Sequence, residues 1–209
     1  MISNYVCLRP GHYYQMFKTG PGPEYNKNYI SYWDSMNNEP LSTIRYNLLT
    51  RHIKSFDSIL DFGYGNGNFL SVCQKHGKNC FGYDISDYPL PDGIKFVFDI
   101  KHQPVDVVSF FDSLEHLTES DLVTFLLSIP TKHLIISVPH FHEQAGANWF
   151  TSWKHRKPNE HFHHFDIEGL TGLLKEADYD TIYCGNDEDV IRRPVDHNTN
   201  ILTVIAKKR

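Results

Sequence analysis

The stretch "ILDFGYGNGNFL", residues 59–70, joins a short apolar run to an aspartate and to three glycines in alternate positions. The apolar run predicts a buried strand. Phe69, Val72 and Cys73 then recur at helical spacing and predict a helix that ends near Gly77. A glycine-rich turn between a strand and a helix allows the backbone to approach a ligand closely, because glycine has no side chain. The stretch therefore predicts a ligand-binding turn at the carboxyl end of a strand.

The rest of the chain alternates further apolar runs with helical patterns. Strands are expected at "NCFGYDI", "IKFVFDI", "VDVVSFF" and "HLIISVP", and helices at "LTESDLVTFLLSIP" and "FDIEGLTGLLKEA". Thr118 and Asp166 are the expected N-caps of these helices. The last two strands, "YDTIYCG" and "ILTVIAK", leave no room for an obvious crossover helix, so an antiparallel pair is expected. The predicted fold class is α/β, with a doubly wound, mostly parallel seven-stranded sheet that ends in a C-terminal antiparallel hairpin.

Composition narrows the class of protein. The chain has 209 residues and a formal net charge of −5, which fits one domain over residues 1–209 and disfavours duplex DNA or an anionic membrane as its main partner. No apolar run approaches the roughly 20 residues that span a bilayer. The N-terminus lacks the pattern of a signal peptide, and four scattered cysteines are expected to be reduced, so a cytoplasmic location is expected. Two segments depart from the strand–helix pattern: a tyrosine-rich arm at 1–50 and a histidine-rich segment at 139–165.

The glycine spacing indicates the kind of ligand. The pattern is G-x-G-x-G, and Asn68 stands where a dinucleotide fingerprint would place its third glycine, which disfavours a nicotinamide oxidoreductase. Such a loop suits a nucleoside that carries a compact zwitterion. Asp84 ends the second strand, 23 residues after Asp61, where a carboxylate can accept hydrogen bonds from both ribose hydroxyls.

Four motifs in the same order resemble a known family. "ILDFGYGNGNFL", "CFGYDIS", "VDVVSFFDSLEHL" and "LIISVPH" resemble the motif series of class I S-adenosylmethionine-dependent methyltransferases, and "EHFHHFDIEGLTGLLKEADYD" is similar to a late segment of one branch. That branch includes the ubiquinone-biosynthesis O-methyltransferases and many sugar and natural-product methyltransferases. The resemblance covers roughly residues 55–209. It implies a Rossmann-like methyltransferase with S-adenosyl-L-methionine as cofactor and S-adenosyl-L-homocysteine as product.

The resemblance also implies roles for individual residues. The turn around the methionine part of the cofactor would be formed by Asp61, Gly63, Tyr64, Gly65 and Gly67, although a tyrosine at 64 is unusual in this family. Asp84 would bind the ribose and Ile85 would pack on one face of the adenine. The remaining contacts would come from Asp99 and Ile100 at the adenine edge and from the backbone of Phe111 near the methionine amino group.

Four residues are candidates for the base that removes a proton from the acceptor: His161, His163, His164 and Asp112. Glu115 and His116 are open to either a structural or a catalytic role. His140 with His142, and His161 with His163, form H-x-H pairs that could instead bind a metal on an extended segment. No oxygen-ligand cluster lies near the glycine turn in the sequence, so metal-independent transfer is expected.

The expected acceptor is a small hydroxylated or amine compound, with a sugar or a nucleotide as first choice. Two alternatives remain open: methylation of nucleic acid, disfavoured by the charge and by the lack of a D/N-P-P-Y motif, and a non-catalytic cofactor-binding protein. The arm and the segment 139–165 are expected to close over the acceptor, and the early aromatic residues form either a lid or an arm packed on the sheet. The residues concerned are Tyr13, Tyr14, Tyr25, Tyr29, Tyr32 and Trp33 in the arm, and Trp149, Trp153, Lys154, Arg156 and Lys157 in the segment. The oligomeric state is not indicated.

Overall fold

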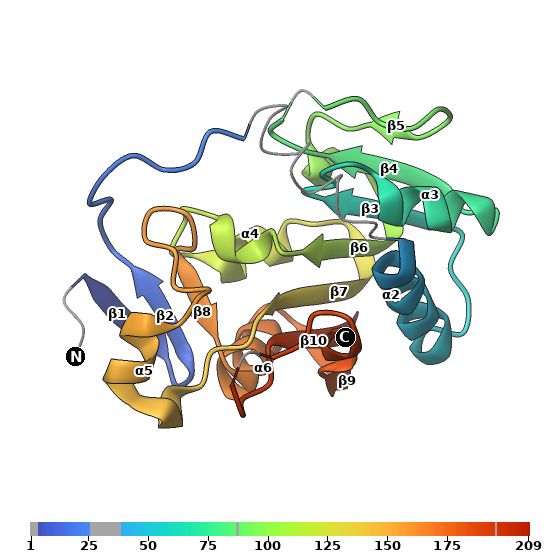
Figure 1. The fold of residues 1–209 in the computed structure, drawn as a ribbon. Coiled ribbons are helices and arrows are strands. Elements are labelled where there is room, and N and C mark those ends of the chain that lie inside the picture. The colour runs from blue at the N-terminus through green and yellow to red at the C-terminus, as the bar shows by residue number, and fades with distance from the viewer. Residues whose placement is uncertain (1–3, 26–38, 87, 195) are drawn as a thin grey trace.

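A seven-stranded sheet forms the centre of the protein in a computed structural model that describes residues 4–25, 39–86, 88–194 and 196–209 (Figure 1). Its strand order is β5-β4-β3-β6-β7-β10-β9. The strands are β3 (Ser58–Phe62), β4 (Asn79–Tyr83), β5 (Lys95–Phe96), β6 (Val105–Phe111), β7 (Thr131–Pro139), β9 (Tyr179–Gly185) and β10 (Ile201–Lys208). The first five run parallel, and β10 lies antiparallel between β7 and β9. The predicted sheet and its C-terminal antiparallel hairpin are therefore confirmed.

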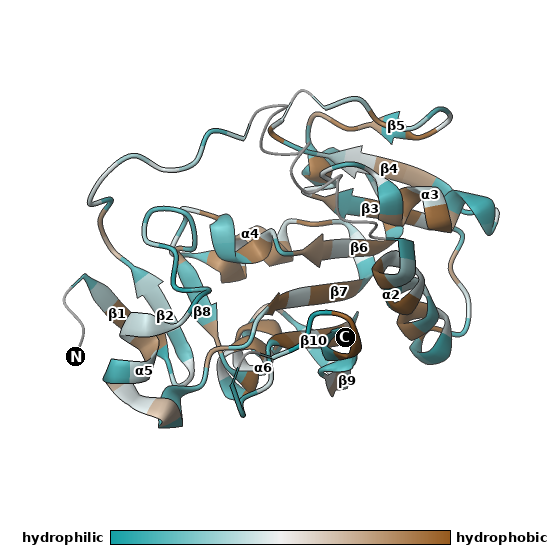
Figure 2. Ribbon diagram, viewed as in Figure 1, coloured by the Kyte–Doolittle hydropathy of each residue, from teal (hydrophilic) through white to brown (hydrophobic). Residues whose placement is uncertain are grey.

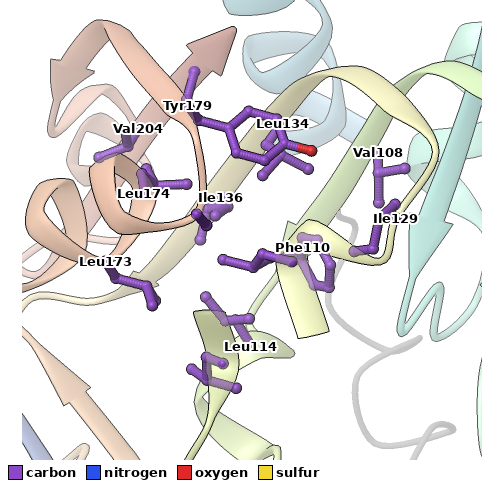
Figure 3. Close-up of a cluster of buried hydrophobic side chains, with 14 of the residues drawn as sticks. Val108, Phe110, Leu114, Ile129, Leu134, Ile136, Leu173, Leu174, Tyr179 and Val204 are labelled. Atoms are coloured by element: carbon purple, nitrogen blue, oxygen red, sulfur yellow. The ribbon is translucent and has the colours of Figure 1, made fainter. Parts of the chain in front are cut away.

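Helices cover both faces of this sheet. Two of them, α2 (Glu39–His52) and α3 (Asn68–Lys75), pack on one face, and α4 (Leu122–Leu127) and α6 (Ile167–Glu176) pack on the other. A hydrophobic core lies on each face of the sheet, and β6 contributes side chains to both. Val108 and Phe110 face α4 and α6, while Val107 faces α2 and α3. Figure 3 shows the first of these cores, where Leu174 of α6 points toward Ile136 of β7.

Burial on both faces explains the composition of the central strands. β6, β7 and β10 are apolar along most of their length in Figure 2, and most of their residues are buried. A parallel sheet between two helical layers has no solvent face and needs no polar alternation. The unbroken apolar runs in the sequence are thus a consequence of the position of these strands in the sheet.

A smaller antiparallel sheet lies beside the carboxyl end of β7. It has the order β1-β2-β8 and contains β1 (Tyr5–Arg9), β2 (His12–Gln15) and β8 (His163–Phe165). The helix α5 (Gly146–Ser152) packs against it through an aromatic cluster of Tyr5, Phe141, Phe150 and Trp153. The first two strands of the N-terminal arm therefore pack against the segment 139–165, and the described parts of both contain more regular structure than their sequences indicate.

Two predicted elements differ from the structure. The helix expected over 117–130 is shorter, because Asp121 rather than Thr118 caps it by accepting a hydrogen bond from the Thr124 N–H at 3.0 Å. The carbonyl of Thr118 instead accepts a hydrogen bond from the hydroxyl of Tyr14. The third expected strand is reduced to the two residues of β5 at the sheet edge. The N-cap at Asp166 is confirmed, because its side chain accepts a hydrogen bond from the Gly169 N–H at 2.8 Å.

One long helix was not expected from the sequence. α2 buries Leu41, Arg45, Leu48 and Leu49, which recur at intervals of three and four residues. This spacing is a helical signal within the segment that was interpreted as loop-rich. Four short 3-10 helices complete the described chain: η1 (Ile100–His102), η2 (Leu114–His116), η3 (Glu143–Ala145) and η4 (Asp187–Val190). In the part of the chain described, no helix is long and apolar enough to span a membrane.

Candidate active site

The strand order reverses at the centre of the large sheet. β3 and β6 are neighbours, but the chain goes from β3 outward to β4 and β5 before it returns to β6. Ligands of open α/β sheets bind outside the carboxyl ends of the strands at this type of reversal. The glycine turn after β3, Asp84 after β4 and Phe111 at the end of β6 all lie at this edge. The topology thus brings the predicted cofactor residues together.

The glycine turn has a backbone that only glycine adopts easily. Gly63, Gly65 and Gly67 have φ angles of 80°, 55° and 72°. The Gly63 N–H donates to the carbonyl of Tyr83 at 2.7 Å, which fixes the turn to the end of β4. A Cβ atom on Gly65 would have nothing within 4 Å, whereas one on Gly63 would lie 2.7 Å from the Cβ of Ser113. The turn is therefore closed on the Ser113 side and open at Gly65, where a ligand can approach the backbone.

Asp84 is fixed beside this open position. Its two carboxylate oxygens accept hydrogen bonds from the Gly65 N–H at 2.9 Å and from the Ser86 N–H at 2.8 Å. Each oxygen retains a further lone pair for an external hydroxyl donor. The next side chain, Ile85, is 71% exposed and offers an apolar surface for a flat aromatic base. These features fit the ribose and adenine of S-adenosylmethionine.

Asp61 lies deeper, at the end of β3. Its carboxylate is 3% exposed and accepts a hydrogen bond from the Ser109 hydroxyl at 2.8 Å. Burial raises the pKa of Asp61 to about 7, and the hydrogen bond and Arg45 offset only part of this effect. A nearby positive charge would favour its ionised form, which is the electrostatic requirement for binding an ammonium group.

Three other predicted cofactor residues do not present their side chains at the turn. Tyr64 is 5% exposed, and its hydroxyl donates to the carbonyl of Tyr88, so only its backbone is available to a ligand. Ile100 is buried in the core below α4 and α6. The carboxylate of Asp99 is exposed and accepts a hydrogen bond from the Lys101 N–H within η1. Contacts from Asp99 and Ile100 to an adenine remain predictions.

Phe111 lies below a charged network that sequence reasoning did not find. The guanidinium of Arg45 lies 4.1 Å from the centroid of the Phe111 ring. Arg45 also pairs with Glu188 at 2.7 Å and with Asp112 at 3.2 Å, and Arg192 pairs with Asp112 at 2.7 Å. Burial alone would raise the pKa of Asp112, but the charges of Arg192 and Arg45 hold it below its usual range. A carboxylate of low pKa is a weak proton acceptor, so this geometry favours an electrostatic role for Asp112 rather than that of base.

The three candidate histidines lie in different environments. Both ring nitrogens of His163 have partners: Nδ1 lies 2.9 Å from Nε2 of His12, and Nε2 lies 3.0 Å from the carbonyl oxygen of Glu119. His164 is buried among the rings of Tyr5 and Phe150. His161 is also buried, and its Nδ1 has no hydrogen-bond partner among the described residues. Nε2 of His164 is likewise buried without a partner among the described residues, so both His161 and His164 keep a free ring nitrogen, and His161 is the one that lies beside Glu115 and His116.

His161 belongs to a group with Glu115 and His116. One ligand atom from each of these side chains lies within 4.8 Å of the others. The carboxylate of Glu115 is 1% exposed, and burial, together with the charge of Asp112, raises its pKa well above the usual range. Ser113, which closes the cofactor turn at Gly63, lies two residues before Glu115. The group is therefore next to the predicted donor site.

A family model described as a methyltransferase domain matches residues 32–183. The chain belongs to this family. Many solved structures, methyltransferases among them, have the same fold as this chain. The 1,6-didemethyltoxoflavin N1-methyltransferase of Burkholderia thailandensis, solved with its acceptor and S-adenosylhomocysteine, has a TM-score of 0.61 at 14% identity, and the match covers 99% of both chains.

Two further structures agree with this assignment. The magnesium protoporphyrin IX methyltransferase of Synechocystis, solved with S-adenosylhomocysteine, has a TM-score of 0.60 at 14% identity, with 82% of this chain and 84% of that chain covered. A methyltransferase dependent on S-adenosylmethionine from Archaeoglobus fulgidus has a TM-score of 0.57 at 19% identity, with 81% and 94% covered. No curated protein sequence matches the chain. The protein is thus a methyltransferase that uses S-adenosylmethionine.

Proposed function

We propose that this methyltransferase acts on a small hydroxylated or amine acceptor, with a sugar or a nucleotide as the first choice. The observation that carries this proposal is the meeting of two sets of residues at one edge of the sheet. The open glycine turn with Asp84 fits a nucleoside donor, and the group of Glu115, His116 and His161 lies beside it. The net charge of −5 supports a small molecule over nucleic acid.

The donor site would hold the cofactor through residues that follow two strands, β3 and β4. Asp84 would accept hydrogen bonds from the ribose, Ile85 would cover the adenine, and the backbone around Gly65 would lie against the methionine part. Bound S-adenosylmethionine supplies an activated sulfonium methyl group. The work left to the protein is to orient the acceptor in line with that methyl group and to exclude water.

The acceptor site would be enclosed by the arm and the segment 139–165. The two segments already contact one another, because Tyr5 packs edge-on to Phe150 and the Tyr13 hydroxyl donates to Glu143 at 2.6 Å. Tyr25 reaches His116, with its hydroxyl 2.7 Å from Nδ1. Tyr29, Tyr32 and Trp33 lie outside the described residues. These contacts support a shared cover over the acceptor.

The basic residues of the segment are less available to an anionic acceptor than their sequence indicates. The guanidinium of Arg156 lies over the ring of Tyr5, and Lys157 pairs with Glu160 at 2.9 Å. Trp149 stacks on Trp153 and donates to Asp196. Lys154 remains exposed. The geometry therefore favours an acceptor with at most one phosphate group over a multiply phosphorylated one.

The donor site is tested by isothermal titration with S-adenosylhomocysteine. Asp84→Ala removes the acceptor of the ribose hydroxyls, and hydrogen bonds to a charged group contribute about 1.5–3 kcal/mol each. We expect a loss of affinity of at least about tenfold. Asp92→Ala, at an exposed aspartate of the neighbouring loop, is the control and should keep the wild-type affinity. Equal affinity in wild type and Asp84→Ala would overturn the donor site.

The acceptor class is tested by following methyl transfer from labelled S-adenosylmethionine to a panel of sugars, nucleosides, phenols and small amines, with duplex and single-stranded RNA and DNA in parallel. Transfer to a small compound supports the proposal. Transfer confined to the nucleic acids would overturn it.

A further inference from the structure

Glu115, His116 and His161 come together from two segments that are distant in the sequence. The first two are in η2, directly after β6, and the third precedes β8. The Phe162 N–H donates to the carbonyl of Glu115 at 2.8 Å, so the two segments are fixed side by side. Among the residues that the structure describes, this is the one group of at least three histidine, cysteine or acidic side chains whose ligand atoms converge, within 4.8 Å of each other.

The group contains polar atoms that the protein itself does not satisfy. Both carboxylate oxygens of Glu115 and Nδ1 of His161 are buried and have no hydrogen-bond partner within the described chain. Glu115 is 1% exposed and His161 is 4% exposed. Buried polar atoms are almost always paired, because an unpaired one loses its hydration without compensation. Unpaired atoms on two adjacent side chains point to a ligand that binds between them.

His116 is oriented toward the same point. Its Nδ1 is occupied by the Tyr25 hydroxyl at 2.7 Å, while its Nε2 lies 3.9 Å from Oε1 of Glu115. Metal-binding histidines commonly use one ring nitrogen as ligand and fix the ring through a hydrogen bond at the other. Tyr25 provides such a hydrogen bond to His116.

We propose that Glu115, His116 and His161 bind one divalent cation of the first transition series, such as Zn²⁺, Mn²⁺ or Co²⁺. Two imidazoles and one carboxylate match these ions, whereas Mg²⁺ and Ca²⁺ prefer oxygen ligands alone. Ligands of one such ion lie about 2.0–2.2 Å from it, so side-chain shifts on the order of 1 Å would close the site.

Three protein ligands leave coordination positions open, as in catalytic rather than structural zinc sites. Ser113, two residues before Glu115, packs against Gly63 of the donor turn, so the group follows directly on a residue that contacts this turn. If the proposed function holds, an acceptor hydroxyl would bind the cation at one of these open positions, and the cation would lower the pKa of that hydroxyl. With a cation at this position, methyl transfer would depend on a metal, contrary to the metal-independent transfer expected from the sequence.

The H-x-H pairs are not the ligands in this arrangement. Nδ1 of His140 lies 2.6 Å from the hydroxyl of Thr199, and Nε2 of His142 lies 2.8 Å from the carbonyl oxygen of the same residue. His163 is held by His12 and by the carbonyl of Glu119. The cation site instead takes one member of the second pair, His161, and joins it to residues that lie 45 and 46 positions earlier.

The test is metal binding by the full chain without a histidine tag, stripped with EDTA and dialysed. Isothermal titration with each chloride salt should show one equivalent of Zn²⁺ or Co²⁺ per chain, and Mg²⁺ should bind at least about tenfold more weakly. Bound Co²⁺ should give visible absorption bands of a mixed nitrogen and oxygen ligand set. Glu115→Gln and His161→Ala should each lower Zn²⁺ affinity by more than about tenfold. Removing a residue that only hydrogen-bonds to a metal ligand already lowers metal affinity about 10–100-fold, and removing a ligand itself should cost at least as much.

His140→Gln is the matched control. His140 is buried and its ring packs against that of His142, but it does not belong to the group of Glu115, His116 and His161. The Zn²⁺ affinity of His140→Gln should stay within about twofold of the wild type. Glu115→Gln is nearly isosteric, and its melting temperature without metal shows that it folds. The proposal is overturned if wild type binds none of these ions, or if Glu115→Gln and His161→Ala bind them as tightly as wild type. If the wild-type protein binds Zn²⁺ as expected but does not bind S-adenosylhomocysteine, the proposed donor site is wrong and the cation site stands.

Discussion

Two aspartates in neighbouring strands illustrate how local surroundings set acidity. Burial raises the pKa of Asp61 in β3 to about 7. Asp106 in β6 accepts hydrogen bonds from the Asp57 and Ser58 N–H groups at 3.0 and 3.1 Å. The hydrogen bond from Asp57, together with Lys132, lowers the pKa of Asp106 to about 2. The two carboxyls should therefore affect stability in different ranges of pH.

Asp61→Asn should change the pH dependence of stability between about pH 4 and pH 7. In this window the unfolded chain, with an aspartate pKa of about 3.9, has lost the proton that folded Asp61 retains. The free energy of unfolding of wild type relative to Asp61→Asn should thus fall as pH rises, by at most about 1.4 kcal/mol per pH unit. Urea unfolding of the cofactor-free protein at several pH values measures this difference.

Asp106→Asn is the control of opposite sign. The folded pKa of Asp106 is below that of the unfolded chain, so its stabilising contribution is present above about pH 4 and is lost as pH falls toward about 2. The difference in the free energy of unfolding between wild type and Asp106→Asn should therefore not change from about pH 5 to pH 7. If the difference in the free energy of unfolding between wild type and Asp61→Asn also stays constant over this range, the pKa of Asp61 is not raised.

At the scale of elements, two helices begin with an aspartate cap in different environments. Asp166 is 8% exposed, caps the ten-residue helix α6, and donates its own N–H to the carbonyl of Gly11 at 2.8 Å. Asp121 is exposed and caps the six-residue helix α4. The first cap thus also joins α6 to the β1–β2 turn.

Asp166→Ala should destabilise the protein by about 1–2 kcal/mol, because the Gly169 N–H loses its partner in a buried position. Asp121→Ala should cost less, about 0.5–1 kcal/mol, because water replaces the lost hydrogen bond. Urea unfolding at constant pH measures both values. The interpretation is wrong if Asp121→Ala is the more damaging of the two.

At the scale of the whole molecule, one buried ion-pair network connects three parts of the chain. Arg45 of α2 binds Glu188 of η4, and both are joined to Asp112, after β6, directly or through Arg192. The side chain of Glu188 is fully buried and that of Arg45 is 10% exposed. The network lies over Phe111 and fixes α2 against the carboxyl end of the sheet.

Arg45→Met should destabilise the protein by up to about 3–5 kcal/mol, because Glu188 would remain buried with only part of its compensating charge. Adding Glu188→Met should restore much of the loss, since two apolar side chains of similar volume replace the pair. Denaturant unfolding of the single and double variants gives the coupling free energy.

Lys75→Met provides the comparison with an exposed ion pair that also involves α2. Lys75 bridges α3 to Glu39 of α2 at 3.0 Å, but both side chains are more than 60% exposed. Its loss should cost less than about 1 kcal/mol. A similar cost for Arg45→Met and Lys75→Met would show that the buried network adds no special stability.

The sequence by itself determined the features that depend on neighbouring residues. Alternate glycines, Asp84 at a strand end and Asp166 before an amphipathic stretch each specify a turn, a ligand position or a cap within a few residues. The alternation of apolar runs with helical patterns indicated a mostly parallel sheet covered by helices on both faces. The mostly parallel sheet with its antiparallel hairpin could therefore be predicted, whereas the donor site stays a prediction.

Only the tertiary structure decided which distant residues meet. Arg45 pairs with Glu188 across 143 positions, and Glu115 meets His161 although nothing in their spacing connects them. His163 and His161 look alike in the sequence, yet pairing of β8 with the N-terminal hairpin gives partners to the first and leaves a free nitrogen on the second. Local patterns specify strands, helices and turns, whereas burial and pairing depend on how these elements pack, and packing determines which polar side chains are left to bind a ligand.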